Sequence, residues 1–143
     1  MVASLRSLLF LCLFGLSWSY SIEVKSGATD CFIVKTSAGV PITGSYEVIH
    51  PDAEMIGVTV VGPNNYKHFE KIAPYFNKGK IDEDVEASEG FFSFDSEFDG
   101  DYTMCISNGN SEVNDGLERI VAFNFRAVAM GEQDYQFVGL QSE

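Results

Sequence analysis

The sequence is poor in the residues that catalytic and metal-binding sites use most. It contains two histidines, His50 and His68, and three cysteines among its 143 residues. Neither histidine is part of a recognisable nucleophile motif with serine or cysteine. Two histidines do not make a zinc site when the available cysteines are bridged to each other. We therefore expect two surface histidines without a catalytic role, no enzyme activity, no metal and no cofactor.

Basic residues are also scarce. The chain has 9 lysines and arginines against 21 aspartates and glutamates, which gives a formal net charge of -12 at pH 7. A strongly acidic chain repels nucleic acid and anionic membrane surfaces, so we expect no nucleic-acid partner. No apolar run of about 18 residues follows the N-terminal region, so no transmembrane helix is expected there. The chain also has no Asn-x-Ser/Thr glycosylation signal.

One acidic segment is similar in its spacing to a calcium-binding loop. Asp95, Glu97, Asp99 and Asp101 occupy every second position before an apolar run. An EF-hand loop needs a glutamate at its twelfth position, and the residue at that position here is Ile106. The segment is therefore predicted to be a solvated acidic turn.

The N-terminal residues have the three-part pattern of a secretory signal peptide. A short region with one positive charge, Arg6, precedes an apolar core over residues 8–16, and the small residues Ser17 and Ser19 follow. The apolar core is shorter than the roughly 20 residues that span a bilayer, which disfavours the alternative of an N-terminal anchor helix. We predict that residues 1–19 are a cleaved signal peptide. Loss of Arg6 then changes the net charge from -12 to -13.

The remaining chain consists of short runs that alternate between apolar and polar residues. Over residues 100–108, for example, Tyr102, Met104 and Ile106 alternate with Cys105 and polar residues, as in a strand with one apolar face. Turn-forming Gly, Pro and Asn residues separate the runs, and no helical segments alternate with them. The pattern predicts an all-β fold, an antiparallel β-sandwich of about seven to eight strands. The other predicted strands are residues 21–25, 31–36, 43–49, 55–61, 90–95 and 117–128.

Three segments have no strand pattern. Residues 66–79 carry apolar residues at a helix-like spacing that Pro74 interrupts, and we predict a short irregular or helical connection. The acidic residues 81–89 are predicted to be a solvated loop or edge. Residues 129–143 show no periodicity.

One predicted strand is unusually aromatic. Alternation places Phe92 and Phe94 on the same face, where they are expected to fill the core. Phe91 is on the other face and is therefore predicted to be available as part of a binding surface.

The cysteines predict a disulfide. Cys12 leaves with the signal peptide, and Cys31 and Cys105 remain, each in a strand-like run. Oxidising compartments favour pairing, so we expect a Cys31–Cys105 bridge; the alternative is two buried free thiols. The bridge would span 105 minus 31, or 74, positions. A loop of this length could contribute about 4 kcal/mol to stability in the chain-entropy account, which is itself disputed.

Motifs around these two cysteines occur in a specific order. The first motifs are Asp30-Cys31-Phe32, then Gly44-Ser45-Tyr46-Glu47-Val48, then a valine-rich strand that ends at Gly62-Pro63. The later motifs are Phe91-Phe92-Ser93-Phe94, then Gly100-Asp101-Tyr102-x-x-Cys105-x-x-Asn108, then Val121-Ala122-Phe123-Asn124-Phe125. Together with the signal peptide they resemble the GOLD (Golgi dynamics) domain of the TMED family, the transmembrane cargo receptors of the early secretory pathway. The resemblance covers about residues 21–126.

The resemblance implies a lumenal β-sandwich with one disulfide, which maps onto Cys31 and Cys105. It implies that the domain binds secretory cargo proteins for transport between endoplasmic reticulum and Golgi, and associates with other family members as a homo- or hetero-oligomer. It also implies a location in the lumen of these compartments, in a single-pass type I membrane protein if the full-length product carries the family's membrane span. Coat proteins would be partners only through a cytosolic tail. This chain lacks the usual coiled coil, membrane span and tail.

The predicted organisation has three parts. Residues 1–19 are the signal peptide, residues 20–128 are the GOLD-like lumenal domain, and residues 129–143 are the start of a truncated stalk or a disordered tail. An alternative function is that of a soluble secreted β-sandwich that binds a ligand, either a carbohydrate or one linked to calcium in the acidic loops.

Overall fold

The computed structural model describes residues 19–72, 88–128 and 137–142 of the chain. Within these ranges the chain forms nine β-strands and no helix, which confirms the predicted all-β class. The count is slightly above the seven to eight strands that were predicted. The strands are β1 (Tyr20–Val24), β2 (Thr29–Thr36), β3 (Pro41–His50), β4 (Ile56–Val61), β5 (Lys67–Ile72), β6 (Glu89–Asp95), β7 (Gly100–Asn108), β8 (Arg119–Ala127) and β9 (Phe137–Ser142).

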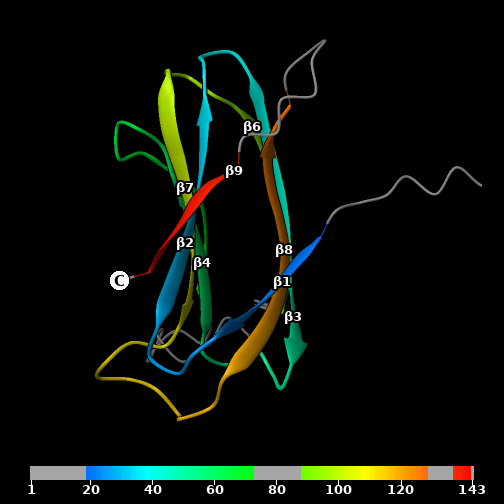
Figure 1. The fold of residues 1–143 in the computed structure, drawn as a ribbon, viewed down its shortest axis with the longest axis vertical. Coiled ribbons are helices and arrows are strands. Elements are labelled where there is room, and N and C mark those ends of the chain that lie inside the picture. Colours follow the sequence, from blue (N-terminus) through cyan, green and yellow to red (C-terminus); the bar gives the residue numbers. More distant parts are fainter. Residues whose placement is uncertain (1–18, 73–87, 129–136, 143) are drawn as a thin grey trace, which may run out of the picture.

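The strands form two antiparallel sheets that face each other as a sandwich (Figure 1). The four-stranded sheet has the order β1-β8-β3-β6, and the five-stranded sheet has the order β5-β4-β7-β2-β9. Strands from opposite ends of the chain are neighbours, because β1 pairs with β8 and β2 pairs with β7. The predicted β-sandwich is therefore confirmed.

The core lies between the two sheets and follows the predicted alternation. In β4, Ile56, Val58 and Val60 are fully buried, because every second side chain of a strand points to the same face. In β7 the inward set is the predicted one, and it is fully buried as well. The core residues are Val24, Phe32, Ile42, Tyr46, Ile56, Val58, Val60, Phe92, Tyr102, Met104, Ile106, Val121 and Phe123.

Phe92 is the centre of an aromatic group in this core. Its ring centroid lies 5.1 Å from that of Phe69 and 5.9 Å from that of Phe125. Gly44 lies directly opposite Phe92 on β3, and a Cβ atom there would lie 2.2 Å from Phe92 Cζ. Glycine at position 44 therefore allows the ring to lie across the neighbouring strand.

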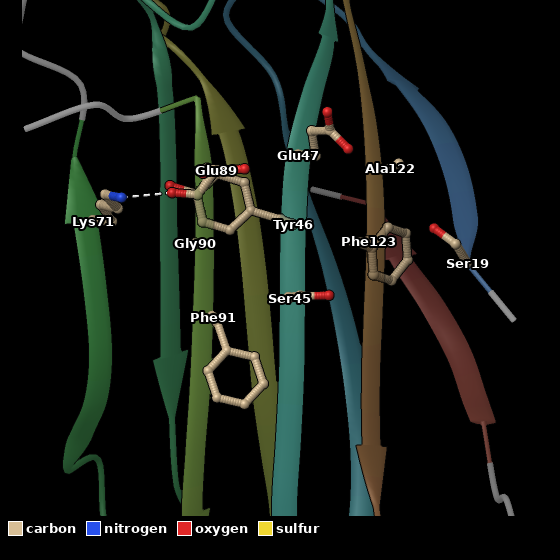
Figure 2. A pocket seen from close by; sticks show the side chains of 10 residues that line it. All are labelled: Ser19, Ser45, Tyr46, Glu47, Lys71, Glu89, Gly90, Phe91, Ala122 and Phe123. Carbon is tan, nitrogen blue, oxygen red and sulfur yellow. Dashed lines mark hydrogen bonds between the residues drawn. The ribbon is translucent and has the colours of Figure 1, made fainter. Parts of the chain in front are cut away.

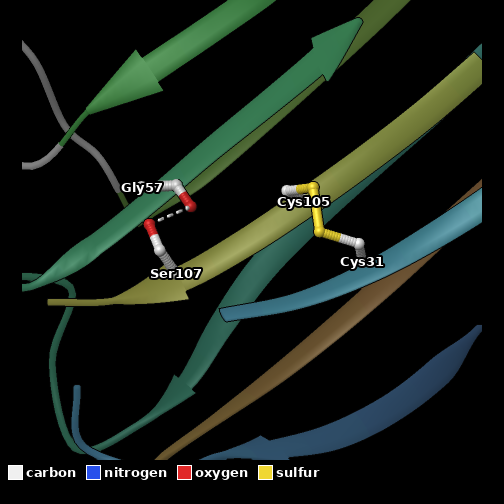
Figure 3. Close-up of a disulfide and its surroundings, with 4 residues drawn as sticks. All are labelled: Cys31, Gly57, Cys105 and Ser107. Carbon is white, nitrogen blue, oxygen red and sulfur yellow. Dashed lines mark hydrogen bonds between the residues drawn. A yellow bond between two sulfur atoms is a disulfide. The ribbon is translucent and has the colours of Figure 1, made fainter. Parts of the chain in front are cut away.

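The predicted disulfide joins the two central strands β2 and β7. Cys31 and Cys105 lie directly opposite each other in this pair, with their Cα atoms 4.1 Å apart and their Sγ atoms 2.08 Å apart. Figure 3 shows the bridge on the same face of the sheet as Ser107, whose hydroxyl donates to the carbonyl oxygen of Gly57 on β4 at 3.2 Å. The bridge therefore links strands from the two ends of the domain, as expected from the sequence.

Two strands were not predicted. Residues 67–72 form β5, so the expected irregular or helical connection is wrong for that part; residues 73–79 lie outside the described residues. A turn after β4, in which Asn65 N–H donates to Gly62 O at 3.0 Å, returns the chain antiparallel to β4. Pairing with β4 thus overrides the local helix-like spacing. The second missed strand is β9 in the segment without periodicity, which pairs with β2.

Candidate binding surface on the four-stranded sheet

The outer face of the four-stranded sheet carries one large apolar side chain among small ones. Phe91 on β6 is 69% exposed, as predicted, whereas its neighbour Phe92 is 5% exposed and points into the core. Ser45 lies directly opposite Phe91 on β3, and Asn124 lies opposite Ser45 on β8. Because these neighbours are short, the Phe91 ring rises above the sheet, where it is available to another molecule.

Two carboxylates lie beside Phe91 on the same face. Glu47 and Glu89 are directly opposite each other on β3 and β6, and both are exposed. Among the described residues neither carboxylate takes part in an ion pair. Like charges at opposing positions of a sheet repel each other, so this part of the face favours a positively charged group.

A hollow of about 520 Å³ lies at this end of the sheet (Figure 2). Its described lining includes Ser45, Glu47 and Phe91 on the sheet face and Lys71 of β5. Lys71 Nζ donates to the carbonyl oxygen of Glu89 at 2.5 Å, as the dashed line in Figure 2 shows. Apolar, acidic and hydroxyl groups therefore meet here, which suits a peptide-like ligand better than a purely apolar one.

The two histidines have different surroundings. His50 is exposed, as predicted, and immediately precedes Pro51. His68 is half-buried instead, with its ring stacked on Phe94 at 4.1 Å between centroids and 5.6 Å from Tyr102. Burial lowers the pKa of His68 below its usual value, although the nearby Glu97 carboxylate opposes the shift. The pattern of residues 66–79 did not predict this aromatic contact, because it depends on β5 being a strand.

The acidic turn after β6 is held by backbone contacts. Asp99 Oδ1 accepts a hydrogen bond from the backbone N–H of Ala38 at 2.7 Å, and Asp95, Glu97 and Asp101 are exposed. In the part of the chain that the structure describes, no three His, Cys, Asp or Glu side chains are grouped so that they could hold a metal ion. The side chain of Asp99 thus joins two turns of the sandwich.

Arg119 is the centre of a polar network that the sequence analysis missed. It begins β8 and is fully buried. Its Nη2 donates to Asp52 Oδ1 at 2.6 Å and to Asp115 Oδ2 at 2.7 Å, and its Nη1 donates to Asn108 Oδ1 at 2.9 Å. Asn108 Nδ2 in turn donates to Val24 O at 3.0 Å. The network therefore ties two loops to the ends of β1, β7 and β8.

The charges of this network stabilise one another. The hydrogen bonds from Arg119 hold the pKa of Asp115 at about 2, below its model value of 3.8, and also lower the pKa of Asp52. In return, the hydrogen bond to Asp115 raises the pKa of Arg119. Strand alternation contained a signal for this site, because position 119 has the same inward parity as Val121 and Phe123. The network is a structural support and lies apart from Phe91 in the strand register.

The described residues thus define a disulfide-linked β-sandwich that presents an open sheet face with apolar and acidic groups. The chain belongs to the emp24/gp25L/p24 family/GOLD, because the model of that family matches residues 19–139. The members of this family are non-enzymatic cargo receptors of the early secretory pathway. The resemblance to the GOLD domain of the TMED family is therefore confirmed.

Other comparisons add little. No curated protein matches the sequence. One solved structure with some similarity is the Aeromonas hydrophila protein PliG, a periplasmic lysozyme inhibitor of g-type lysozyme. It is 10% identical, the match covers 76% of this chain and 86% of that chain, and the TM-score of 0.45 is too low to carry an argument. Among the described residues no helix has the length and apolar character needed to cross a bilayer.

Proposed function

We propose that this chain is the lumenal domain of a vesicular-transport receptor, and that it binds cargo or partner proteins between the endoplasmic reticulum and the Golgi. The match of the family model to residues 19–139 is the observation that carries the proposal. A disulfide between Cys31 and Cys105 is consistent with an oxidising lumen. Residues 1–19 would direct the chain there, residues 20–128 would form the binding domain, and residues 129–143 would lead towards a stalk or tail.

The face around Phe91 is the proposed contact surface. A side chain that is 69% exposed can bury most of its apolar surface against a partner, and large aromatic side chains are enriched at protein interfaces. The unpaired carboxylates of Glu47 and Glu89 add charge selectivity beside it. Related family members are proposed as further partners in homo- or hetero-oligomers. Coat proteins would bind only a cytosolic tail of the full-length product, which would then be a single-pass type I membrane protein.

The test is a depletion and rescue experiment in secretory cells. The arrival of newly made secretory proteins in the Golgi is followed by their acquisition of resistance to endoglycosidase H. Depletion is expected to delay a subset of these proteins, and the wild-type chain in its full-length product is expected to restore them. The variant Phe91→Ser is expected to restore them poorly, because it removes the exposed ring without touching the core.

Leu117→Ser is the matched control. Leu117 is also an exposed apolar residue, at 48%, but it lies in the loop before β8. This variant should rescue transport as well as the wild type does. Depletion without a delay of any secretory protein would refute the receptor function. Equal rescue by Phe91→Ser would leave that function intact and refute the proposed surface.

A further inference from the structure

Strand β6 forms an edge of the four-stranded sheet. Among the described residues it pairs only with β3, so its other side has no strand beside it. Just beyond its two ends, Ser96 N–H donates to Val40 O at 2.9 Å, and Ser88 O accepts from Val48 N–H at 2.7 Å. Ladder bonds alternate along an antiparallel pair, so the even-numbered residues of β6 direct their backbone groups to β3. The odd-numbered residues direct theirs away from it.

A side-chain contact marks one end of this open edge. Lys71 of β5 donates its Nζ to Glu89 O at 2.5 Å, which shows that the carbonyl of an odd-numbered residue does point away from β3 (Figure 2). Beyond this contact, Phe91 and Ser93 present their N–H and C=O groups without a strand partner among the described residues. An edge with such groups is a template for an added strand.

The side chains at the same positions specify what could be added. Phe91, Ser93 and Asp95 are exposed on the outer face, because successive odd-numbered residues of a strand share a face. An added strand would place one side chain directly opposite each of them, close enough to interact. An apolar side chain is favoured opposite Phe91 and a basic one opposite Asp95. These two positions are four residues apart, 95 minus 91.

We infer that the edge of β6 binds an extended segment of a partner protein by strand addition, with an apolar residue opposite Phe91 and a basic residue opposite Asp95. The inference rests on the proposed function and names the chemistry of the partner. Backbone hydrogen bonds to Phe91 and Ser93 hold the segment, and the two side-chain pairs select it. The net charge of -12 favours approach of a basic segment from a distance.

A second copy of this chain fits the edge poorly. Full antiparallel overlap of two β6 strands places Glu89 of one copy opposite Asp95 of the other, so like charges meet. It also requires Lys71 to leave the carbonyl of Glu89. A shorter overlap that keeps Lys71 in place puts Phe91 opposite Asp95, an apolar group against a charge. The edge therefore favours a foreign basic segment over self-pairing.

The probe is a short synthetic peptide of alternating threonine and valine with lysine four positions before leucine. In antiparallel orientation the lysine lies opposite Asp95 and the leucine opposite Phe91. Binding to the mature chain is measured by fluorescence anisotropy. Methylation of the two peptide amides that face Phe91 and Ser93 is expected to weaken binding about tenfold, since each lost hydrogen bond contributes about 1 kcal/mol. Replacement of the lysine by glutamate is expected to weaken it by a similar factor, and added salt should reduce this charge effect.

Ser93 provides a matched pair of protein variants. Ser93→Pro removes the outward N–H of an edge residue, a position where sheets tolerate proline, and should weaken peptide binding about tenfold. Ser93→Ala keeps the N–H and should bind the peptide within about twofold of the wild type. Should Ser93→Pro fail to fold, the methylated peptide with the wild-type chain makes the same test.

Several results would overturn the inference. They are no binding of the peptide, equal binding of the methylated peptide, or equal binding of the glutamate peptide. Dimers of the chain alone that Ser93→Pro abolishes would make a second copy the occupant. Transport rescue separates this inference from the proposed function: full rescue by Ser93→Pro refutes the edge alone, whereas depletion without effect refutes the receptor function alone.

Discussion

Replacement of Arg119 by methionine tests the buried polar network. The variant keeps an unbranched side chain in the buried position but removes the hydrogen bonds to Asp52, Asp115 and Asn108. Asn108 is fully buried, and an unsatisfied buried acceptor costs about 1–3 kcal/mol. The lost charge-assisted bonds involve carboxylates that are 41% and 26% exposed, so after solvent screening they add only about 1–2 kcal/mol. We expect Arg119→Met to lower the free energy of unfolding by about 2–5 kcal/mol at neutral pH.

The loss should depend on pH in a defined direction. In the folded protein Asp115 has a pKa of about 2, below the model value of 3.8, so the folded state binds its proton less tightly than the unfolded state does. Its contribution to stability is therefore complete above pH 3.8 and is lost as the pH falls towards about 2. The contribution is at most about 2 kcal/mol, and partial exposure of the carboxylate reduces it. The difference in stability between wild type and Arg119→Met should shrink over this range.

Urea denaturation of both proteins at neutral pH and at several acidic pH values measures this difference. Arg126→Met is the control, because Arg126 lies on the same strand but is exposed, with Nε 3.4 Å from Thr43 Oγ1. The control should change the free energy of unfolding by less than about 0.5 kcal/mol. A loss below about 1 kcal/mol for Arg119→Met, or a difference that does not shrink in acid, would refute this account of the network.

Three further predictions concern the core and the disulfide. Replacement of both Cys31 and Cys105 by serine opens a bridge across 74 positions and should cost up to about 4 kcal/mol; an unchanged melting temperature of the oxidised proteins would contradict it. Phe92→Ala should cost about 3–5 kcal/mol in urea denaturation. Phe91→Ala should cost less than about 0.5 kcal/mol, because its side chain is 69% exposed; equal costs would show that the two faces are misassigned. Gly44→Ala should cost about 1–3 kcal/mol, since the new Cβ would lie 2.2 Å from Phe92 Cζ, and calorimetry that shows no loss would rule out that contact.

Local patterns were sufficient for the individual strands and their faces. The alternation of Tyr102, Met104 and Ile106 with polar residues identified the buried face of β7, and the same reasoning separated Phe91 from Phe92. These predictions succeed because the two-residue period of a strand depends only on the chain itself. Strand β5 was missed because its type is decided by pairing with β4, and its own residues have a helix-like spacing.

The motifs around the cysteines also had the information for the family, the sandwich and the disulfide between Cys31 and Cys105. With two cysteines left in the mature chain, only one pairing was available.

The sequence alone determined the fold class, the inward and outward faces of most strands, the disulfide and the acidic character of the chain. Only the tertiary structure decided the order of the strands, the open edge at β6 and the partners of Arg119. The physical reason is the distance along the chain: Asp52 and Arg119 are 67 residues apart, and their contact depends on how both sheets assemble. An arginine at the start of a strand has no local sign that two carboxylates will surround it, whereas a hydrophobic alternation is complete within a few residues.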